Sequence, residues 1–447
     1  MTKNCVLLTI DSLRADHTTD KSGLMPQLTE YAASGVQFTQ TYSNGYSTPI
    51  SFPTILTGTY ADHYGGHGYM SNDRPFLATK FQTAGYETAG FHTNPHLRDD
   101  KNYDLGFKTY NDFDDEAGQL SKFRYFITQN LDSSSASYRL LKRAYHFFRT
   151  TSGSNDYTEA PKLNQKALTW LDEEHDDENP FFLWTHYMDV HYPFYPPDEF
   201  LTDRSISNKR AISVNGKMHE ENVDLSDTDA DDLRALYRGE VRYMDHHIGE
   251  LLDDLKERGL FDETVFIITS DHGELFGEHG LFGHPPSGYE ESFRVPFVIF
   301  GPGIPDGQRV DQLGSLLDLP PTVADLFDLD ADPNWEGESL LPYIQGDQET
   351  SEKGMYLGDT DVLSYQTSEW RLIWWRTRDN PEQPDREWEL RRLPECERVP
   401  LAEHEAVVDR FREKLKEYLD RTDDQEDLAE PAVDKTTEER LEALGYK

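Results

Sequence analysis

The stretch Thr264–Glu274, TVFIITSDHGE, runs from apolar residues straight into an acid, an imidazole and a second acid. Its first part, Val265–Thr269, has the length and the β-branched content of a buried strand. Comparable apolar runs bounded by turn residues lie at Val6–Ile10, Phe181–Tyr187 and Val295–Phe300. Because helical patterns separate these runs, the sequence predicts an α/β fold with a doubly wound, mostly parallel sheet covered on both faces.

Three of these runs lead into side chains of catalytic type. Asp11 follows Val6–Ile10. Asp189 and His191 follow Phe181–Tyr187, and Asp271 and His272 follow Val265–Thr269. A single Asp after a strand is usually a helix cap or a turn residue, but ligands of open α/β sheets bind where the carboxyl ends of the strands meet. Carboxylates with an imidazole and no thiolate suit a divalent cation. The sequence therefore predicts a metal site at this edge of the sheet.

The composition of the 447 residues is strongly acidic, with 84 acidic and 43 basic residues and a net charge of −41. Such a surface repels nucleic acid, and no basic stripe is present. The acids are spread along the whole chain, which predicts a halophilic protein. Cys5 and Cys396 form neither a disulfide framework nor a metal-binding pair. The apolar run Val6–Ile10 is too short for a signal sequence or a membrane span, so we expect a cytoplasmic protein.

The α/β pattern extends over residues 1–325, which we predict to be the catalytic domain. It contains a predicted helical insertion at about 114–175, an acidic loop at His219–Asp232 and an amphipathic helix at Leu236–Leu255. Residues 326–447 predict a small C-terminal lobe of α+β type, with short strands and a charged helix, followed by a tail. The sequence does not indicate an oligomeric state.

Four motifs together resemble the sulfatase family of the alkaline phosphatase superfamily. They are TIDSLRADH at 9–17, the hydroxyl- and proline-rich loop closing on LTG at 56–58, YMDHHIGELLDDLKERGLFDETVFIITSDHGELFGEHGLFGH at 243–284, and YEESFRVPFVIFGPG at 289–303. The ending ERLEALGYK also resembles a common sulfatase tail. The resemblance covers about Thr2 to Asp325. It implies an alkaline phosphatase-like sheet, metal-assisted attack on a sulfate or phosphate ester, and a covalent intermediate on a nucleophile in the loop.

The nucleophile loop reads NGYSTPISFPTILTG at 44–58. Sulfatases that use formylglycine carry Cys or Ser here, followed at fixed spacing by Pro and Arg; counting back from Gly58 places Thr48 at the nucleophile position and Phe52 at the Arg position. A β-branched Thr cannot become formylglycine, so Thr48 instead resembles the attacking hydroxyl of nucleotide pyrophosphatases and glycerol-phosphate transferases. Two alternatives stay open: Ser47 is the nucleophile, or both hydroxyls satisfy a turn.

The resemblance also implies the ligands of one divalent metal ion, which are Asp11, Thr48, Asp271 and His272. Many sulfatases have a second Asp where this chain has Ser12. The cage for Ca²⁺ is therefore one carboxylate short, which favours Mn²⁺ or Zn²⁺ over Ca²⁺.

Further roles are implied residue by residue. His191 matches a histidine that contacts the ester oxygens or the leaving group, and His284 occupies a Lys position and would protonate the leaving oxygen. Asn72 matches a position that binds a non-bridging oxygen of the substrate. The family's Lys-x-His motif is missing, and Asn94 and Pro95 stand in its place. Two further histidines, His246 and His247, are expected to be surface or packing residues of the amphipathic helix.

The preferred function is hydrolysis of sulfate esters, with a small molecule or a sulfated or phosphorylated glycan as the substrate. The alternative, favoured by Thr48 and the missing Arg, is a phosphodiesterase, phosphonate monoester hydrolase or phospho-group transferase of the same superfamily. A catalytically inactive binding protein is disfavoured, because all the metal-type residues are retained. The sequence does not identify the esterified alcohol.

Overall fold

The computed structural model describes residues 3–111, 158–218, 225–346, 351–382 and 387–422. Most of the predicted insertion at 114–175 and the tail with ERLEALGYK lie outside these residues. The described part of the insertion contains the helix α6 (Ala160–Glu173).

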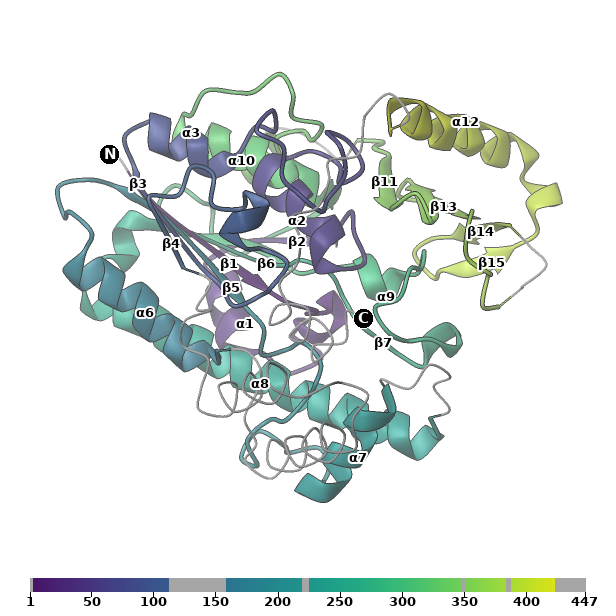
Figure 1. Ribbon diagram of the computed structural model, residues 1–447, viewed down its shortest axis with the longest axis horizontal. Helices are drawn as coiled ribbons and strands as arrows, with labels where there is room; N and C mark the ends of the chain where they lie inside the picture. The colour runs from purple at the N-terminus through teal and green to yellow at the C-terminus, as the bar shows by residue number, and fades with distance from the viewer. Residues whose placement is uncertain (1–2, 112–157, 219–224, 347–350, 383–386, 423–447) are drawn as a thin grey trace, which may run out of the picture.

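A mostly parallel sheet forms the centre of the protein (Figure 1). Its described strands follow in the order β10 (Gln308–Ser315), β2 (Gly35–Tyr42), β9 (Phe297–Phe300), β6 (Thr264–Ser270), β1 (Asn4–Ile10), β5 (Phe181–Tyr187), β3 (Glu87–Phe91) and β4 (Thr109–Asn111). Among these strands β9 alone runs antiparallel to its neighbours β2 and β6. The predicted α/β class and the mostly parallel sheet are thus confirmed.

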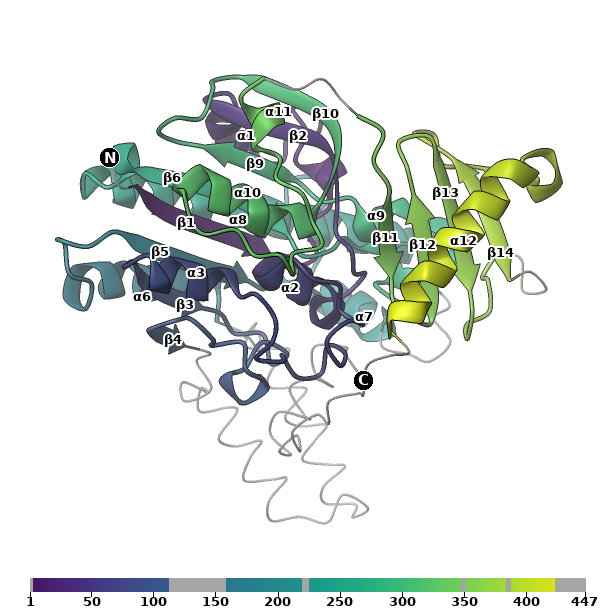
Figure 2. The same cartoon turned by 90° about the horizontal axis from the view of Figure 1, so that it is seen from above.

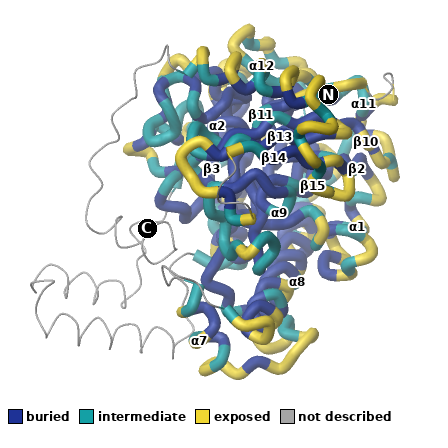
Figure 3. The backbone as a smooth tube through the Cα atoms, turned by 90° about the vertical axis from the view of Figure 1, so that its right-hand side faces the viewer, coloured by how far each residue is buried: buried dark blue, intermediate teal, exposed yellow. Residues whose placement is uncertain are grey.

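Helices cover both faces of the sheet (Figure 2). Alternate residues of β1 point to opposite faces, as the pleat of a strand requires. Val6, Leu8 and Ile10 pack with α1 (Pro26–Ala32), α6 and the long α8 (Asp227–Glu257). Cys5 and Leu7 pack on the other face with α2 (Thr48–Thr57), α3 (Leu77–Thr83), α10 (Leu319–Phe327) and α11 (Leu341–Ile344). Figure 3 shows buried residues in the interior of the protein, with exposed residues mainly in the loops and on the outer turns of helices.

The helix α8 begins earlier than the sequence predicts, so residues 227–232 are helical rather than part of an acidic loop. Ser226 and Asp229 form a capping box, in which each side chain accepts a hydrogen bond from the other residue's backbone N–H. Asp229 also pairs with Arg210 and Lys217 of α7 (Asn208–Met218). The acidic run is therefore neutralised by a neighbouring helix that local sequence does not reveal.

The C-terminal lobe is a separate antiparallel sheet beside the main sheet (Figures 1 and 2). Its strands are β11 (Met355–Gly358), β12 (Val362–Gln366), β13 (Trp370–Trp375), β14 (Trp388–Arg392) and β15 (Glu397–Val399). The amphipathic helix α12 (Glu405–Thr422) packs on it through Val408, Phe411 and Leu415. The predicted lobe is confirmed. The boundary expected at residue 325 falls inside α10, which belongs to the core of the main sheet.

Short elements complete the architecture. The pair β7 (Leu275–Phe276) and β8 (Phe282–Gly283) and the helix α9 (Glu290–Phe293) follow the end of β6. In the described part of the chain, none of the helices combines the length and the apolar character that crossing a membrane requires.

Candidate active site

Strand register brings the predicted acids together. Ile10, the last residue of β1, pairs with Tyr187 of β5 on one side and with Ser270 of β6 on the other. The residues that follow Ile10 and Ser270 are Asp11 and Asp271, and both are fully buried. Because the three strands are parallel neighbours, their carboxyl ends place these two carboxylates side by side.

Tight backbone packing holds the two strand ends in place. Ser12 has a positive φ of 60°, which lets its N–H donate to Asp271 Oδ1 at 3.2 Å while its hydroxyl donates to Asp11 Oδ1 at 2.9 Å. Gly273 donates its N–H to the carbonyl of Ser292, and a Cβ at this position would lie 2.0 Å from the carbonyl oxygen of Glu291. The glycine after Asp271 and His272 is therefore required by a close approach of two backbone segments.

The Thr48 hydroxyl bridges the two carboxylates. Its Oγ1 donates towards Asp11 Oδ2 at 3.2 Å and Asp271 Oδ2 at 2.9 Å, and the residue is fully buried. Thr48 is the first residue of α2, after an extended Ser47 and before Pro49, which suits the first turn of a helix. The start of α2 thereby aims this hydroxyl at the acids, with the positive end of the helix dipole behind it.

The imidazole of His272 completes the cluster. Its Nδ1 lies 2.8 Å from the carbonyl oxygen of Gly273, a contact that places the ring hydrogen on Nδ1. Its Nε2 therefore presents a lone pair towards Asp11 Oδ1 at 3.5 Å and Asp271 Oδ2 at 3.6 Å. Among the described residues, this buried Nε2 has no hydrogen-bond partner.

These donors fit a divalent cation. Ligand atoms of Asp11, Asp271 and His272 lie within 4.8 Å of one another, and the Thr48 oxygen contacts both acids. An orphaned imidazole nitrogen facing two buried carboxylates is the arrangement that a bound cation would satisfy. The four predicted ligands are thus brought together, with two carboxylate groups, one hydroxyl and one nitrogen.

The two carboxylates differ in their proton affinity. Burial opposes ionisation of Asp11, but His191, His186 and His272 hold the pKa of Asp11 well below its ordinary value. Burial, together with the negative charge of Asp11, raises the pKa of Asp271 to about 7. Two acids that share one buried site cannot both ionise easily, and a bound cation relieves that repulsion.

Two residues of this cluster were not predicted as site residues. The Asn94 amide donates to Asp11 Oδ2 at 3.1 Å and to Thr48 Oγ1 at 3.3 Å. His186 Nε2 lies 3.4 Å from Asp11 Oδ2, and the ring of Phe52 packs edge-on against His186 at 4.8 Å. Phe52, at the position that the sequence resemblance assigns to Arg, therefore packs against His186. The signals were present in the sequence, since Asn94 stands in place of a family motif and His186 lies next to the end of a predicted strand.

A pair of histidines lies on the other side of His272. The rings of His191 and His284 are 5.2 Å apart, and His284 lies 4.6 Å from the ring of His272. Burial lowers the pKa of His191 to about 4, although the negative charge of Asp11 acts to raise it. For His284 burial is outweighed by Glu274, whose carboxylate lies 3.3 Å from Nδ1, and its pKa is raised. The two imidazoles therefore differ in proton affinity, which is the higher at His284.

Other predicted residues lie outside the Asp11 cluster. Asn72 is exposed, accepts a hydrogen bond from Asn102, and lines a cavity of about 650 Å³ beside α3. None of the residues around that cavity belongs to the carboxylate cluster. The side chain of Asp189 is directed to α6, where its Oδ1 accepts from the Ala160 N–H at 3.0 Å.

Comparison with known proteins gives the family of the chain. The family profile described as Sulfatase matches residues 3–329. The chain belongs to the sulfatase family. This sulfatase is 27% identical over 391 residues to an arylsulfatase of Clostridium perfringens, a match that covers 77% of this chain and 79% of the relative. It is also 31% identical over 209 residues to a choline-sulfatase of Rhizobium meliloti, which covers 42% and 40% of the two chains.

Solved structures share the fold of this sulfatase. A phosphonate monoester hydrolase of Agrobacterium radiobacter superposes with a TM-score of 0.70 at 19% identity, over 94% of this chain and 96% of the other. A protein solved with its substrate D-glucosamine-2-N,6-O-disulfate gives a TM-score of 0.69 at 17% identity, over 95% and 99% of the two chains. These likenesses show a shared fold, and membership of the sulfatase family makes the chain an ester hydrolase.

Proposed function

We propose that this sulfatase hydrolyses sulfate esters through a covalent intermediate on Thr48, with one divalent metal ion held by Asp11, Thr48, Asp271 and His272. The observation that carries the proposal is the buried Thr48 hydroxyl, hydrogen-bonded to both carboxylates. When bound, a divalent cation at these residues would neutralise the acids and favour ionisation of the hydroxyl. The incomplete carboxylate set favours Mn²⁺ or Zn²⁺ over Ca²⁺.

The proposed attack forms a bond from Thr48 Oγ1 to the ester sulfur and breaks the bond from sulfur to the alcohol oxygen. The hydroxyl proton passes to Asp271 Oδ2, its partner at 2.9 Å. The departing oxygen takes a proton from His284, because Glu274 favours the charged form of this imidazole, whereas burial keeps His191 neutral. In the second step His284 takes a proton from water, whose oxygen bonds to sulfur. The bond from sulfur to Thr48 Oγ1 breaks, Asp271 returns the proton to this oxygen, and hydrogen sulfate leaves.

Phosphorus is the alternative electrophile. Threonine stands at the nucleophile position, and Phe52, packed on His186, stands where formylglycine sulfatases would carry Arg. Both features favour a phosphodiester or phosphonate monoester as the substrate, with the same attack by Thr48. The Asn94 amide, which contacts Asp11 and Thr48, supports both versions, since it would steady the hydroxyl in either.

Parallel rates on matched aryl esters test the proposal. The purified protein is assayed with 4-nitrophenyl sulfate, 4-nitrophenyl phosphate, bis-4-nitrophenyl phosphate and a 4-nitrophenyl phosphonate, after chelation and addition of Mn²⁺, Zn²⁺ or Ca²⁺. We expect metal-dependent release of 4-nitrophenol that is fastest with the sulfate. Faster turnover of the diester or the phosphonate would favour the alternative, and turnover of all four esters by Thr48→Ala at the wild-type rate would contradict the nucleophile.

A further inference from the structure

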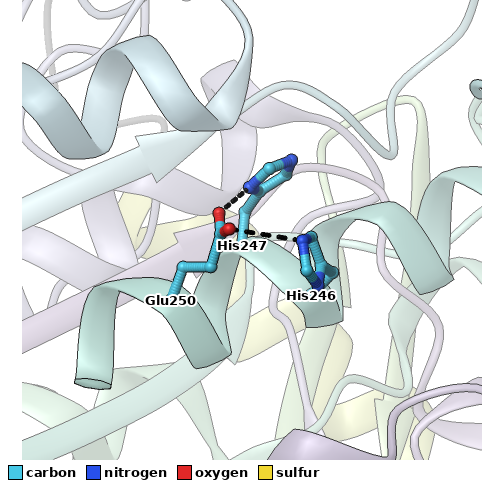
Figure 4. A group of neighbouring side chains, drawn as sticks. All are labelled: His246, His247 and Glu250. Atoms are coloured by element: carbon cyan, nitrogen blue, oxygen red, sulfur yellow. Dashed lines mark hydrogen bonds and ion pairs between the residues drawn. The ribbon is translucent and has the colours of Figure 1, made fainter. Parts of the chain in front are cut away.

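A second cluster of metal-binding type lies on α8, away from the candidate active site. His246 Nε2 is 3.3 Å from Glu250 Oε1, and His247 Nδ1 is 2.6 Å from Glu250 Oε2. Figure 4 shows the two imidazole rings turned towards the one carboxylate, which lies between them. Nitrogen and oxygen atoms of the three side chains lie within 4.8 Å of one another. Sequence reasoning assigned the two histidines to the surface or to packing and did not connect them with Glu250.

Helical spacing explains why the three side chains converge. Residues three and four positions apart are neighbours on the surface of a helix, so Glu250 lies within reach of His247 and of His246 at once. Imidazoles one turn from a carboxylate on a regular helix need no loop to position them. The 31-residue helix α8 is anchored at its start by its capping box, so it supplies a rigid base for these groups.

Packing holds both rings towards the carboxylate. The ring of His247 packs edge-on against Tyr243 at 4.4 Å, and its backbone carbonyl accepts a hydrogen bond from Asn164 of α6 at 2.8 Å. The ring of His246 packs against Phe200 at 5.6 Å. The side chain of His247 is 11% exposed, whereas those of His246 and Glu250 are each 51% exposed. The cluster is thus partly ordered before any ligand binds and is still open to solvent.

The charge around the cluster attracts cations. Glu250 lines a cavity of about 580 Å³ between α6 and α8, together with Asp172, Asp253, Asp254 and Glu257. Arg258 is the basic residue in this lining. In a protein of net charge −41, such a concave acidic surface concentrates divalent ions next to Glu250. Burial also lowers the pKa of His247, despite its contact with Glu250, which favours the neutral imidazole that metals bind.

We propose that His246, His247 and Glu250 form a second metal site that binds Zn²⁺ or a similar transition-metal ion at the surface of α8. Two imidazole nitrogens and one carboxylate are a ligand set of zinc type, and three protein ligands leave a fourth position for water. The candidate active site offers one imidazole nitrogen among mostly oxygen donors, whereas the cluster on α8 offers two imidazole nitrogens. The surface ion would replace the present contacts of the two imidazoles with Glu250 and brace this part of α8.

Calorimetric titration of the full-length protein with Zn²⁺ tests the proposal, with bound metal counted after dialysis. Wild type is compared with His246→Asn and Glu250→Gln, whose side chains are half exposed, and circular dichroism checks that each variant keeps the fold. We expect each variant to bind Zn²⁺ at this site at least about tenfold more weakly and to lose one equivalent at limiting metal. The matched control Glu257→Gln removes a carboxylate from the same acidic cavity and should keep that equivalent.

Two further comparisons make the result decisive. Asp271→Asn, which alters the candidate active site, should retain the equivalent that His246→Asn loses. With Co²⁺ in place of Zn²⁺, the visible absorption that remains in Asp271→Asn, where the active-site ligands are altered, should be lost in the double variant Asp271→Asn/His246→Asn. Equal stoichiometry and affinity in wild type, His246→Asn and Glu250→Gln would overturn the proposal, as would an equal loss in Glu257→Gln. Because ester hydrolysis is not the readout, these outcomes do not depend on the proposed function.

Discussion

At the scale of single residues, the position of Thr48 distinguishes it from its neighbour Ser47. The Thr48 hydroxyl is buried between two acids, whereas the Ser47 side chain makes no capping hydrogen bond at the start of α2. The backbone carbonyl of Ser47 instead accepts from the N–H groups of Ile50 and Ser51. A serine one position away therefore lacks the contacts that would activate it.

We expect Thr48→Ala to lose the chemical step by several orders of magnitude, because the attacking oxygen is removed. Thr48→Ser should keep part of the activity, since the hydroxyl is retained with a looser rotamer. Ser47→Ala is the matched control and should have a mild effect on kcat. Mass spectrometry of the quenched enzyme should find a sulfate or phosphate ester on Thr48. An inactive Ser47→Ala variant, or an aldehyde at residue 47, would restore the formylglycine mechanism.

The carboxylates Asp11 and Asp271 are expected to be needed for the metal and not for the fold. In Asp271→Asn the isosteric amide removes the repulsion between two buried acids, so in chelator the variant should melt no lower than wild type. Added Mn²⁺ should raise the melting temperature of wild type and leave Asp11→Asn and Asp271→Asn unchanged. Asp189→Asn is the control, because this buried carboxylate is directed at α6. Wild-type metal content in Asp11→Asn or Asp271→Asn would contradict the ligand assignment.

At the scale of elements, three adjacent parallel strands build the candidate site. The order β6-β1-β5 places the residues that follow each strand at one edge of the sheet. The loop before α2 brings Thr48 to the same edge, and the turn after β3 brings Asn94. Just after β5 lies Asp189, a buried carboxylate that accepts a hydrogen bond from Ala160 at the start of α6.

The buried carboxylate of Asp189 is expected to make the free energy of unfolding depend on pH. Burial raises its pKa to about 7, well above the roughly 3.9 of an unfolded Asp, so the folded state binds the extra proton. The stabilisation that this proton provides is fully present below about pH 4. The free energy of unfolding should therefore fall as pH rises towards 7. Denaturant midpoints measured in high salt between pH 5 and 8 should therefore fall less in Asp189→Asn than in wild type. Asp198→Asn, which removes an exposed carboxylate, should keep the wild-type slope, and an unchanged slope in Asp189→Asn would refute this assignment.

At the scale of the whole molecule, the C-terminal lobe supports the nucleophile loop. The carbonyl of Asn44 accepts the N–H of Gly358 at 2.8 Å, and the Asn44 amide donates to the carbonyl of Tyr356 at 2.9 Å. The Tyr46 hydroxyl donates to Asp359. Since these contacts join β11 and the turn after it to the residues just before Thr48, the lobe helps to set the position of this proposed nucleophile.

Net charge is the second property of the whole molecule with a testable consequence. An excess of 41 negative charges destabilises the compact state in dilute buffer, where the Debye length is about 10 Å or longer. We expect the melting temperature to fall markedly between molar and 0.1 M KCl, and activity to fall with it. Sodium chloride should act in the same way at equal ionic strength if screening is the cause. A melting temperature that is independent of salt would exclude the halophilic prediction.

Local sequence is sufficient for the parts of the protein that depend on local rules. Apolar runs such as Val265–Thr269 predict buried strands, and the carboxyl ends of parallel strands share an edge, so Asp11, Asp271 and His272 could be expected to meet. The family's spacing to Gly58 favours Thr48 over Ser47 as the nucleophile, and this choice stays a prediction.

Tertiary structure alone decides which loop residues contact the cluster formed by Asp11, Thr48, Asp271 and His272. Asn94 contacts Asp11 and Thr48, whereas Asn72 lies beside α3, because the paths of the loops depend on packing between distant segments. The start of α8 is decided in the same way, by ion pairs between Asp229 and residues of α7. Strand ends follow from periodicity along the chain, but side-chain partners across the fold depend on long-range contacts that no local pattern encodes.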